Sequence, residues 1–248
     1  MTHIRSIFVS LALLAVATPA LAAETKVAVV ANFAEPAKEI AAGFAKATGH
    51  HALLSFAASG ALYEQIVHKA PFEIFLSSDN ERPKKAEQDG IAVKGTRFTY
   101  AIGQLALYST DPRLIDNHGA VLHGGHFTRL AIADPAISPY GVAAVQTMQT
   151  LGVYSADVSR IVKGTSTSQA FHFIATGAAQ LGFVAVSQVI HVPGGSRWIV
   201  PKSLHAPIEH QAILLRTGAN NPAAKAFLQY LRSPAARRII KRYGYETR

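Results

Sequence analysis

The sequence predicts a two-lobed α/β protein, in which each lobe is a mixed, mostly parallel β-sheet flanked by helices and two strands form a hinge. Short β-rich apolar runs alternate with helical patterns along the chain, which is typical of strand–helix–strand units. The chain has 248 residues, a length that suits two units of roughly 100 residues better than one. Two longer β-like runs, Thr99–Ser109 and Glu209–Arg216, bracket the middle of the chain and are the expected hinge strands. We therefore expect residues 23–104 and 206–248 to form lobe I and residues 105–205 to form lobe II.

Residues 1–22 have the pattern of a cleavable signal peptide. Arg5 follows the amino terminus in a positive segment, Ile7–Val16 is a short apolar run, and Ala20-Leu21-Ala22 is an A-x-A cleavage signature. The apolar run is shorter than the roughly 20 residues that a membrane-spanning helix needs. We therefore expect an exported, periplasmic protein that does not insert into the membrane.

The strand candidates of the mature chain are short apolar runs. Most are continuous rather than alternating, as expected for strands that are buried on both faces. They are Lys26–Ala31, Ala52–Phe56, Phe72–Ser77, Leu130–Ala133, Leu181–Val186 and Trp198–Pro201.

The helix candidates lie between these runs. Pro36–Thr48 carries Ile40 and Phe44 one turn apart, and Gly49 follows as a C-cap. Two others begin with proline, which the first helical turn tolerates. The remaining candidates are Ala61–Lys69, Val142–Leu151, Gln169–Thr176, Pro222–Arg232 and Pro234–Tyr243.

Composition excludes several classes of protein. With 49% hydrophobic and 16% charged residues the chain is not disordered, and without cysteine it has no disulfide, thiolate metal site or cysteine nucleophile. The net charge of +9 is concentrated at the end, where residues 225–248 carry a net charge of +6. A nucleic-acid binder would interleave such charges with stacking aromatic residues, so we expect a solvated helix face and no nucleic-acid partner.

Four segments place a small polar or turn residue where a strand or loop ends and a helix begins. The N–H groups of a first helical turn are unpaired and carry the positive end of the helix dipole, so several converging helix starts can bind an oxyanion. Any one of these residues alone is more often a simple helix cap or turn. The segments are Ala31-Asn32-Phe33, Ala58-Ser59-Gly60, Pro139-Tyr140-Gly141 and Ser166-Thr167-Ser168.

Several long stretches resemble one family. VAVVANFAEPAKEIAAGFAKATGH, LLSFAASGALYEQI and APFEIFLSSD, followed by LAIADPAISPYGVAAVQTMQTLG, TSTSQAFHFIATGAAQLGFVA and AFLQYLRSPAARRIIKRYGY, are similar to the periplasmic molybdate-binding proteins of ABC transporters. That family has the type II periplasmic-binding-protein fold. The resemblance implies that Asn32 and Ser59 bind the ligand from lobe I, and that Tyr140 and Thr167 offer backbone N–H groups from lobe II. Ala185 and Ala31 depart from the family, because neither offers the hydroxyl that some members have there.

The resemblance implies a function in transport. The protein would capture molybdate or tungstate as an oxyanion, not as a bare metal ion, and would deliver it to an ABC permease. It would be a monomer without a cofactor and not an enzyme. A binding protein for sulfate, phosphate or a small carboxylate stays open as an alternative. An exported hydrolase that uses Ser59 is disfavoured, because Ala57-Ala58-Ser59-Gly60 lacks the leading glycine of a nucleophile elbow.

Three histidines, His118, His123 and His126, lie close together in a glycine-bearing segment. Their spacing matches no standard metal motif, and a metal site needs ligands held in a fixed geometry. We expect this segment to be a solvated loop.

Overall fold

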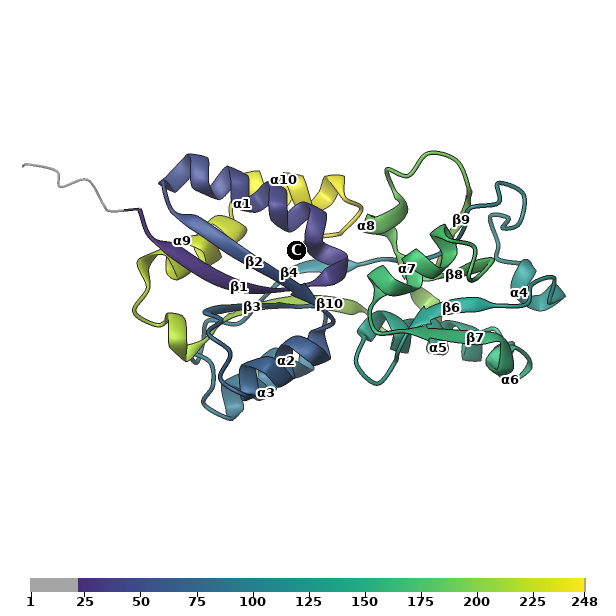
Figure 1. Ribbon diagram of the computed structural model, residues 1–248, viewed down its shortest axis with the longest axis horizontal. Helices are drawn as coiled ribbons and strands as arrows, with labels where there is room; N and C mark the ends of the chain where they lie inside the picture. The colour runs from purple at the N-terminus through teal and green to yellow at the C-terminus, as the bar shows by residue number, and fades with distance from the viewer. Residues whose placement is uncertain (1–21, 248) are drawn as a thin grey trace, which may run out of the picture.

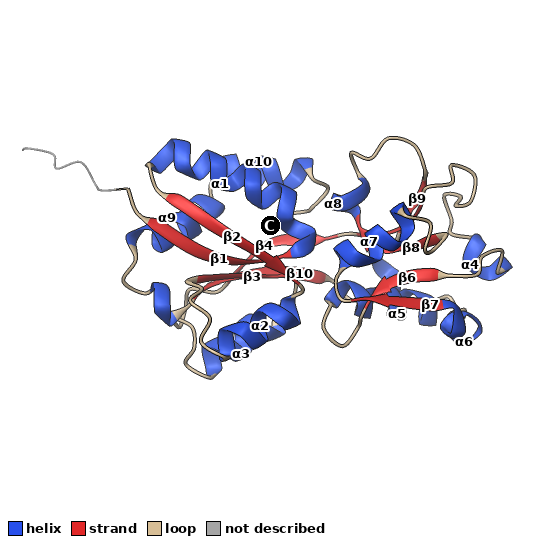
Figure 2. Cartoon of the chain, viewed as in Figure 1, coloured by secondary structure: helices blue, strands red, loops and turns tan. Residues whose placement is uncertain are grey.

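The computed structural model describes residues 22–247, which form two five-stranded sheets side by side along the long axis (Figures 1 and 2). The expected signal peptide lies outside the described residues, apart from Ala22. Within the described part of the chain, no helix is long and apolar enough to cross a membrane.

The first sheet has the strand order β2-β1-β3-β10-β4. Strand β1 pairs in parallel with β2 and β3, whereas β10 runs antiparallel to β3 and β4. The strands are β1 (Glu24–Val30), β2 (His51–Ala57), β3 (Ile74–Ser77), β4 (Phe98–Gly103) and β10 (Ile208–Leu214).

Helices cover both faces of this sheet, as Figure 1 shows. Alternate strand residues face opposite sides: Val27 and Val29 pack in the core under α1, α9 and α10, and Ala28 packs in the core under α2 and α3. Helix α1 ends at Gly49, whose φ of 75° is the left-handed geometry of a glycine cap. The elements are η1 (Ala31–Phe33), α1 (Ala34–Thr48), α2 (Ser59–Val67), α3 (Glu81–Gln88), α9 (Pro222–Leu231) and α10 (Pro234–Arg242), with η4 (Arg216–Gly218) after β10.

The second sheet repeats this arrangement, with the order β7-β6-β8-β5-β9. Strand β6 is parallel to β7 and β8, and β5 is antiparallel to β8 and β9. The strands are β5 (Leu105–Ser109), β6 (Leu130–Ala133), β7 (Ile161–Gly164), β8 (Leu181–Ala185) and β9 (Ser196–Ile199).

The second sheet is also covered on both faces. Helix α5 packs on one face through Ala144 and Met148, and α7 packs on the other through Ala170 and Ile174. The elements are α4 (Val121–Gly124), α5 (Pro139–Thr150), α6 (Tyr154–Asp157), η2 (Val158–Arg160), α7 (Thr167–Ala175), α8 (Val186–Val189) and η3 (Lys202–Leu204). The two sheets confirm the predicted fold class.

The structure corrects several details of the prediction. The run Thr99–Ser109 is two strands, β4 and β5, which separate at Gln104 and enter different sheets. Strand β2 is not buried on both faces, because it is the edge of its sheet and all seven of its residues are partly or fully exposed. Strand β7 and helix α3 were not predicted, because Ile161–Gly164 is short and Glu81–Gln88 is almost entirely polar. The segment of the three histidines contains the short helix α4.

Candidate functional site

The candidate residues lie where parallel strands of the two sheets end against each other. Strands β1 and β2 lead into η1 and α2, and β6 and β7 lead into α5 and α7. The two sets meet across the boundary: η1 packs against α7 and α8, and the Gly60 N–H donates to the Ile137 carbonyl at 3.2 Å. In open α/β sheets this is the edge where ligands bind.

All four candidate residues are buried. Their exposed fractions are 3% for Asn32, 0% for Ser59, 1% for Tyr140 and 3% for Thr167. None of the four side chains is therefore open to solvent in this structure.

Asn32 lies in η1 and is hydrogen-bonded to two residues from other elements. Its Nδ2 donates to the Tyr245 hydroxyl at 2.9 Å, and its carbonyl accepts from the Ser187 hydroxyl at 2.9 Å. Within the described residues its Oδ1 is buried without a hydrogen-bond partner. Ser187 lies on α8, so its bond to Asn32 joins the two lobes.

Ser59 is the first residue of α2 and contacts Ser78, which directly follows strand β3. Its Oγ accepts from the Ser78 N–H at 3.0 Å and lies 3.0 Å from the Ser78 hydroxyl. Because the Ser59 oxygen is already an acceptor, its own proton is free to be donated either to Ser78 or to a ligand. Its backbone N–H belongs to the unpaired first turn of α2.

Tyr140 lies in the first turn of α5, so its backbone N–H has no partner within the helix. Its hydroxyl lies 3.2 Å from Nε2 of His210, and the Tyr100 hydroxyl lies 3.2 Å from Nδ1 of the same ring. Burial raises the pKa of Tyr140 well above its ordinary value, so the phenol stays protonated. Its hydroxyl also interacts with the side chains of Tyr245 and Asn32.

Thr167 is the first residue of α7. Ser166 caps this helix by accepting from the Gln169 N–H at 3.1 Å, which leaves the Thr167 N–H without an intrahelical partner. Since α7 packs against η1, the start of this helix lies on the same boundary as Asn32. The structure thus brings Asn32 and Tyr140 together through Tyr245, and it places the starts of α2 and α7 at the boundary with them.

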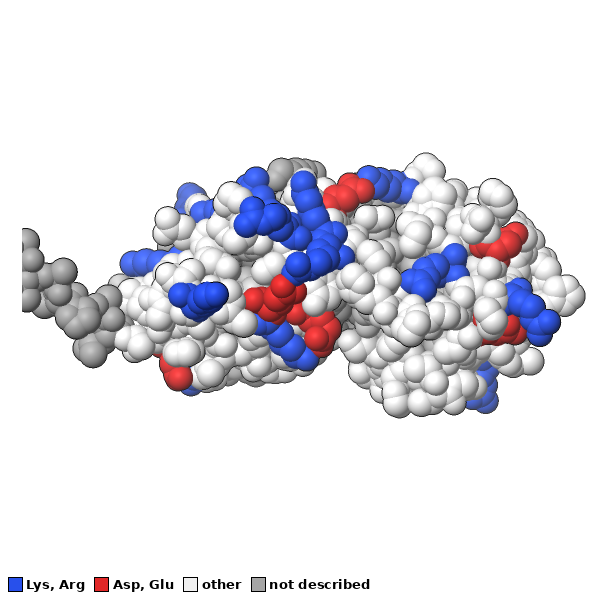
Figure 3. Space-filling model, turned by 90° about the horizontal axis from the view of Figure 1, so that it is seen from above, with Lys and Arg blue, Asp and Glu red and all other residues white. Residues whose placement is uncertain are grey.

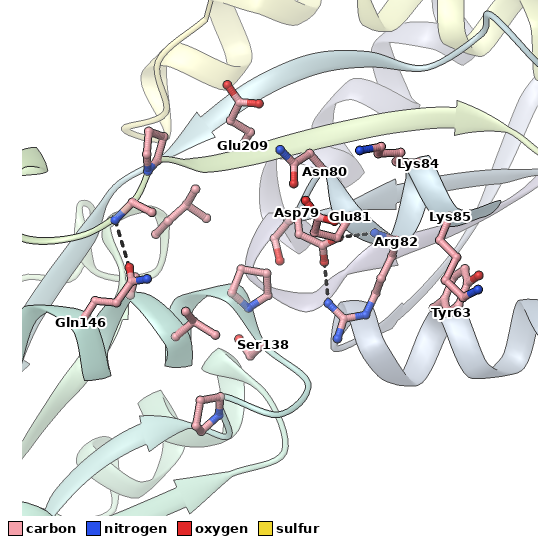
Figure 4. A pocket seen from close by; sticks show the side chains of 18 of the residues that line it. Tyr63, Asp79, Asn80, Glu81, Arg82, Lys84, Lys85, Ser138, Gln146 and Glu209 are labelled. Atoms are coloured by element: carbon pink, nitrogen blue, oxygen red, sulfur yellow. Dashed lines mark hydrogen bonds and ion pairs between the residues drawn. The ribbon is translucent and has the colours of Figure 1, made fainter. Parts of the chain in front are cut away.

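A pocket of about 750 Å³ opens between the lobes beside these residues (Figure 4). Its lining includes Ser78, which is hydrogen-bonded to Ser59, and Ser138, which lies two positions before Tyr140. None of the four candidate residues lines it. Asp79 and Arg82 form an ion pair in its wall, at 2.7 Å. Arg82 also lies beside the start of α2, so the cation nearest to Gly60 is already paired with a carboxylate.

The pocket has a charged lining, formed by Asp79, Glu81, Arg82, Lys84, Lys85 and Glu209, and a second group of basic side chains lies away from it. Lysine and arginine side chains cluster over α1 and α10, as Figure 3 shows, and the six basic residues of α9, α10 and the turn between them are exposed as predicted. In the part of the chain that the structure describes, no group of three or more His, Asp or Glu residues could hold a metal ion.

Four further residues of the boundary were not predicted from the sequence. Ser78 and Ser187 follow β3 and β8 in the same strand-end pattern as the candidates, but neither opens a predicted helix. Tyr245 and His210 reach the boundary from the C-terminal segment and from β10. No local pattern marks these two residues.

The two sheets have the same topology, and the ends of their parallel strands face each other across the boundary. This arrangement defines a two-lobed binding protein of the type II periplasmic-binding-protein fold. The chain belongs to the family of bacterial extracellular solute-binding proteins, whose family model matches residues 25–246. It is therefore a binding protein and not an enzyme.

Within this class, the chain is similar in sequence and in structure to molybdate-binding proteins. The chain is 53% identical to the molybdate-binding protein ModA of Rhodobacter capsulatus over 231 residues, which are 93% of this chain and 91% of the relative. It is 49% identical to ModA of Azotobacter vinelandii over 92% of both chains. The solved periplasmic molybdate-binding protein of Azotobacter vinelandii superposes with a TM-score of 0.87 at 40% identity, covering 90% of this chain and 99% of that one.

Proposed function

We propose that this chain captures molybdate, or the isosteric tungstate, in the crevice between its lobes and delivers it to the permease of an ABC transporter. The observation that carries the proposal is the 53% identity, over nearly the whole chain, to a protein named for molybdate binding. The proposal includes that the chain works in the periplasm as a monomer, in keeping with the leader-like residues 1–22.

The donors at the boundary suit a tetrahedral dianion. Ser59 has a hydroxyl proton to give, Asn32 has an amide, and Tyr140 and Thr167 have N–H groups at helix starts. A helix start favours negative charge through its dipole, and hydrogen bonds to a charged group are stronger than those between neutral groups. None of these residues is charged, so the ion is held by neutral donors rather than by counter-ions.

Closure of the lobes couples binding to transport. Because the four residues are buried, the ion enters an open form and is enclosed when the lobes close. Closure brings donors from both lobes onto the same ion, so the closed form is the one that the ion stabilises. A closed, loaded protein presents a different surface from an open one, and a permease can distinguish the two.

Neutral donors also support selectivity. An anion that leaves a buried donor unpaired loses affinity, and so does a protonated anion that brings a donor of its own. Sulfate has the same charge but is smaller, so we expect it to satisfy fewer donors at once. Sulfate, phosphate and small carboxylates are the competing ligands, and the comparisons favour none of them.

Calorimetric titration of the mature chain with molybdate, tungstate, sulfate and phosphate tests the proposal. We expect tight binding of molybdate and tungstate and much weaker binding of the others. Ser59→Ala should weaken molybdate binding strongly, whereas Ser55→Ala, on the exposed edge strand, should leave it unchanged. Strong sulfate binding without a response to molybdate would overturn the proposal.

A further inference from the structure

Tyr245, near the C-terminus, places its hydroxyl among groups from both lobes. The hydroxyl donates to the Asn32 carbonyl at 2.8 Å, accepts from Asn32 Nδ2 at 2.9 Å and lies 2.9 Å from the Ser187 hydroxyl. Asn32 belongs to η1, Ser187 to α8, and Tyr245 to neither. One phenol from the C-terminal segment therefore contacts a candidate ligand residue and the lobe opposite it.

The C-terminal segment is firmly attached where the chain crosses between the lobes. Ile102 and Glu246 exchange two backbone hydrogen bonds, at 2.8 and 3.0 Å, and the Gln104 side chain donates to the Gly244 carbonyl at 2.9 Å. The Tyr245 ring packs edge-on against Phe33, with the ring centres 5.3 Å apart. The hydroxyl is thus held in place by the backbone and by the ring, independently of its own hydrogen bonds.

The number of protons limits what this cluster can do. The Asn32 carbonyl, the Ser187 hydroxyl and the Tyr245 hydroxyl form a triangle of oxygens with sides of 2.8–2.9 Å. Two hydroxyl protons can serve only two of its three sides at once. Burial raises the pKa of Tyr245, so this phenol keeps its proton and can donate as well as accept.

The two ends of the Asn32 amide are unequally satisfied. Nδ2 is used by Tyr245, while Oδ1 is buried without a partner among the described residues. An oxyanion is an acceptor, so it needs the NH₂ end of the amide and not the oxygen. Rotation of the amide by half a turn exchanges the two ends with almost no change in shape. Tyr245 would then donate to Oδ1, and the NH₂ group would take the place of the unpaired oxygen.

We propose that Tyr245 is a positioning residue for ligand binding: its hydroxyl holds Asn32 by accepting from the NH₂ end of the amide or by donating to the oxygen end, so that the NH₂ group can turn to the bound oxyanion. A hydroxyl can fill both roles because it is both a donor and an acceptor, whereas a phenylalanine at this position can fill neither. This inference rests on the proposed function and adds a residue that the strand-end pattern does not contain.

Calorimetric titration of Tyr245→Phe with sodium molybdate tests the inference, since this variant keeps the ring and removes only the hydroxyl. We expect the affinity to fall about ten- to hundredfold, because the variant loses both hydrogen bonds between Tyr245 and Asn32 and each is worth about three- to tenfold. Tyr108→Phe, which removes the hydroxyl of a buried tyrosine in the second sheet, should bind as the parent does.

A double-mutant cycle separates positioning from general stability. In an Asn32→Ala background, Tyr245→Phe should weaken binding less than about threefold, because the group that it positions is gone. Equal losses in both backgrounds, or unchanged binding by Tyr245→Phe, would overturn the inference and leave the proposed function standing. Failure of the parent chain to bind molybdate would overturn both.

A measurement on the parent chain keeps the inference testable if Tyr245→Phe does not fold. The side-chain ¹⁵N–¹H resonances of Asn32 should shift when molybdate is added, because the NH₂ group exchanges a phenol partner for an anion. Resonances that do not move on saturation would contradict the proposed rotation.

Discussion

The hydroxyl of Tyr140, on α5 of the second lobe, lies 3.2 Å from Nε2 of His210, on β10 of the first sheet. The Tyr100 hydroxyl lies 3.2 Å from Nδ1 and also donates to the Ser77 carbonyl at 3.4 Å. Each ring nitrogen of His210 therefore has a tyrosine hydroxyl within hydrogen-bond distance, Tyr100 from the first lobe and Tyr140 from the second. This buried imidazole links the first turn of α5 to strands β4 and β10 of the first sheet.

Acid should destabilise the protein through His210. Burial lowers the pKa of His210 from its ordinary 6.5 to about 3. Between these values the unfolded chain binds a proton that the folded chain does not. The free energy of unfolding is therefore fully retained above pH 6.5, and it falls by up to about 1.4 kcal/mol per pH unit as the pH drops towards 3.

Urea unfolding at several pH values between 7 and 4 measures this slope. His210→Gln should flatten the slope, while His51→Gln, on the exposed edge strand, should retain it. A His210→Gln protein with the acid slope of the parent would show that another group is responsible.

Gly60→Ala should weaken binding by obstructing closure. A Cβ at this position would lie 3.0 Å from the Ile137 Cβ and 3.2 Å from its Cα, on the opposite lobe. Backbone cannot yield as a flexible side chain can, so the lobes would have to stay slightly apart. We expect the affinity for molybdate to fall about tenfold or more, with little loss of free energy of unfolding, because alanine favours a helix over glycine.

The matched control for this prediction is Gly43→Ala in α1. There the nearest atoms to the new methyl group belong to the end of the Tyr230 side chain on α9, and not to the second lobe. Titration should find its affinity unchanged. Equal affinities for Gly60→Ala and the parent would mean that the ligand is bound without this close approach.

Ser187→Ala should release the ion faster. The variant loses the hydrogen bond of 2.9 Å by which the second lobe holds the Asn32 carbonyl. A single hydrogen bond contributes about 0.5–1.5 kcal/mol, so the dissociation rate should rise about three- to tenfold. Stopped-flow dissociation measures this rate, with the exposed Ser203→Ala as the control. An unchanged rate would show that this bond does not help to hold the closed form.

Most of the fold could be predicted from sequence because its signals are local. The runs that form β6 and β8 are apolar and short, and α1 has apolar residues one turn apart with a glycine at its end. Polar surface elements gave no such signal, which is why α3 was missed. The edge position of β2 depends on which strands pair, and an apolar run does not contain this information.

The candidate site likewise contains residues that a local pattern marks and residues that only the tertiary fold brings together. The segments of Asn32, Ser59, Tyr140 and Thr167 stand out because in each a strand or loop ends and a helix begins, and the family resemblance selects one residue in each. Tyr245 is separated from Asn32 by 213 positions and meets it only through the tertiary fold. His210 lies inside an apolar strand, where a histidine has no pattern that distinguishes a buried link from a surface residue. Contacts of this kind are products of topology, so a linear pattern cannot reveal them.

The basic face should affect the rate of capture but not the affinity. Arg237, Arg238 and Lys241 are exposed on α10, whereas the proposed ligand residues are neutral. Changing all three to glutamine should leave the affinity for molybdate within about twofold. The association rate should fall about two- to fivefold at low salt and match the parent at high salt, because exposed charges act over a Debye length of about 10 Å at 0.1 M.

Stopped-flow association at several salt concentrations tests this, with Lys163→Gln on the second lobe as the control. A tenfold loss of affinity that persists at high salt would place the basic side chains in contact with the ion. The ion would then be held by counter-ions, and neutral helix-start donors would no longer account for its selection.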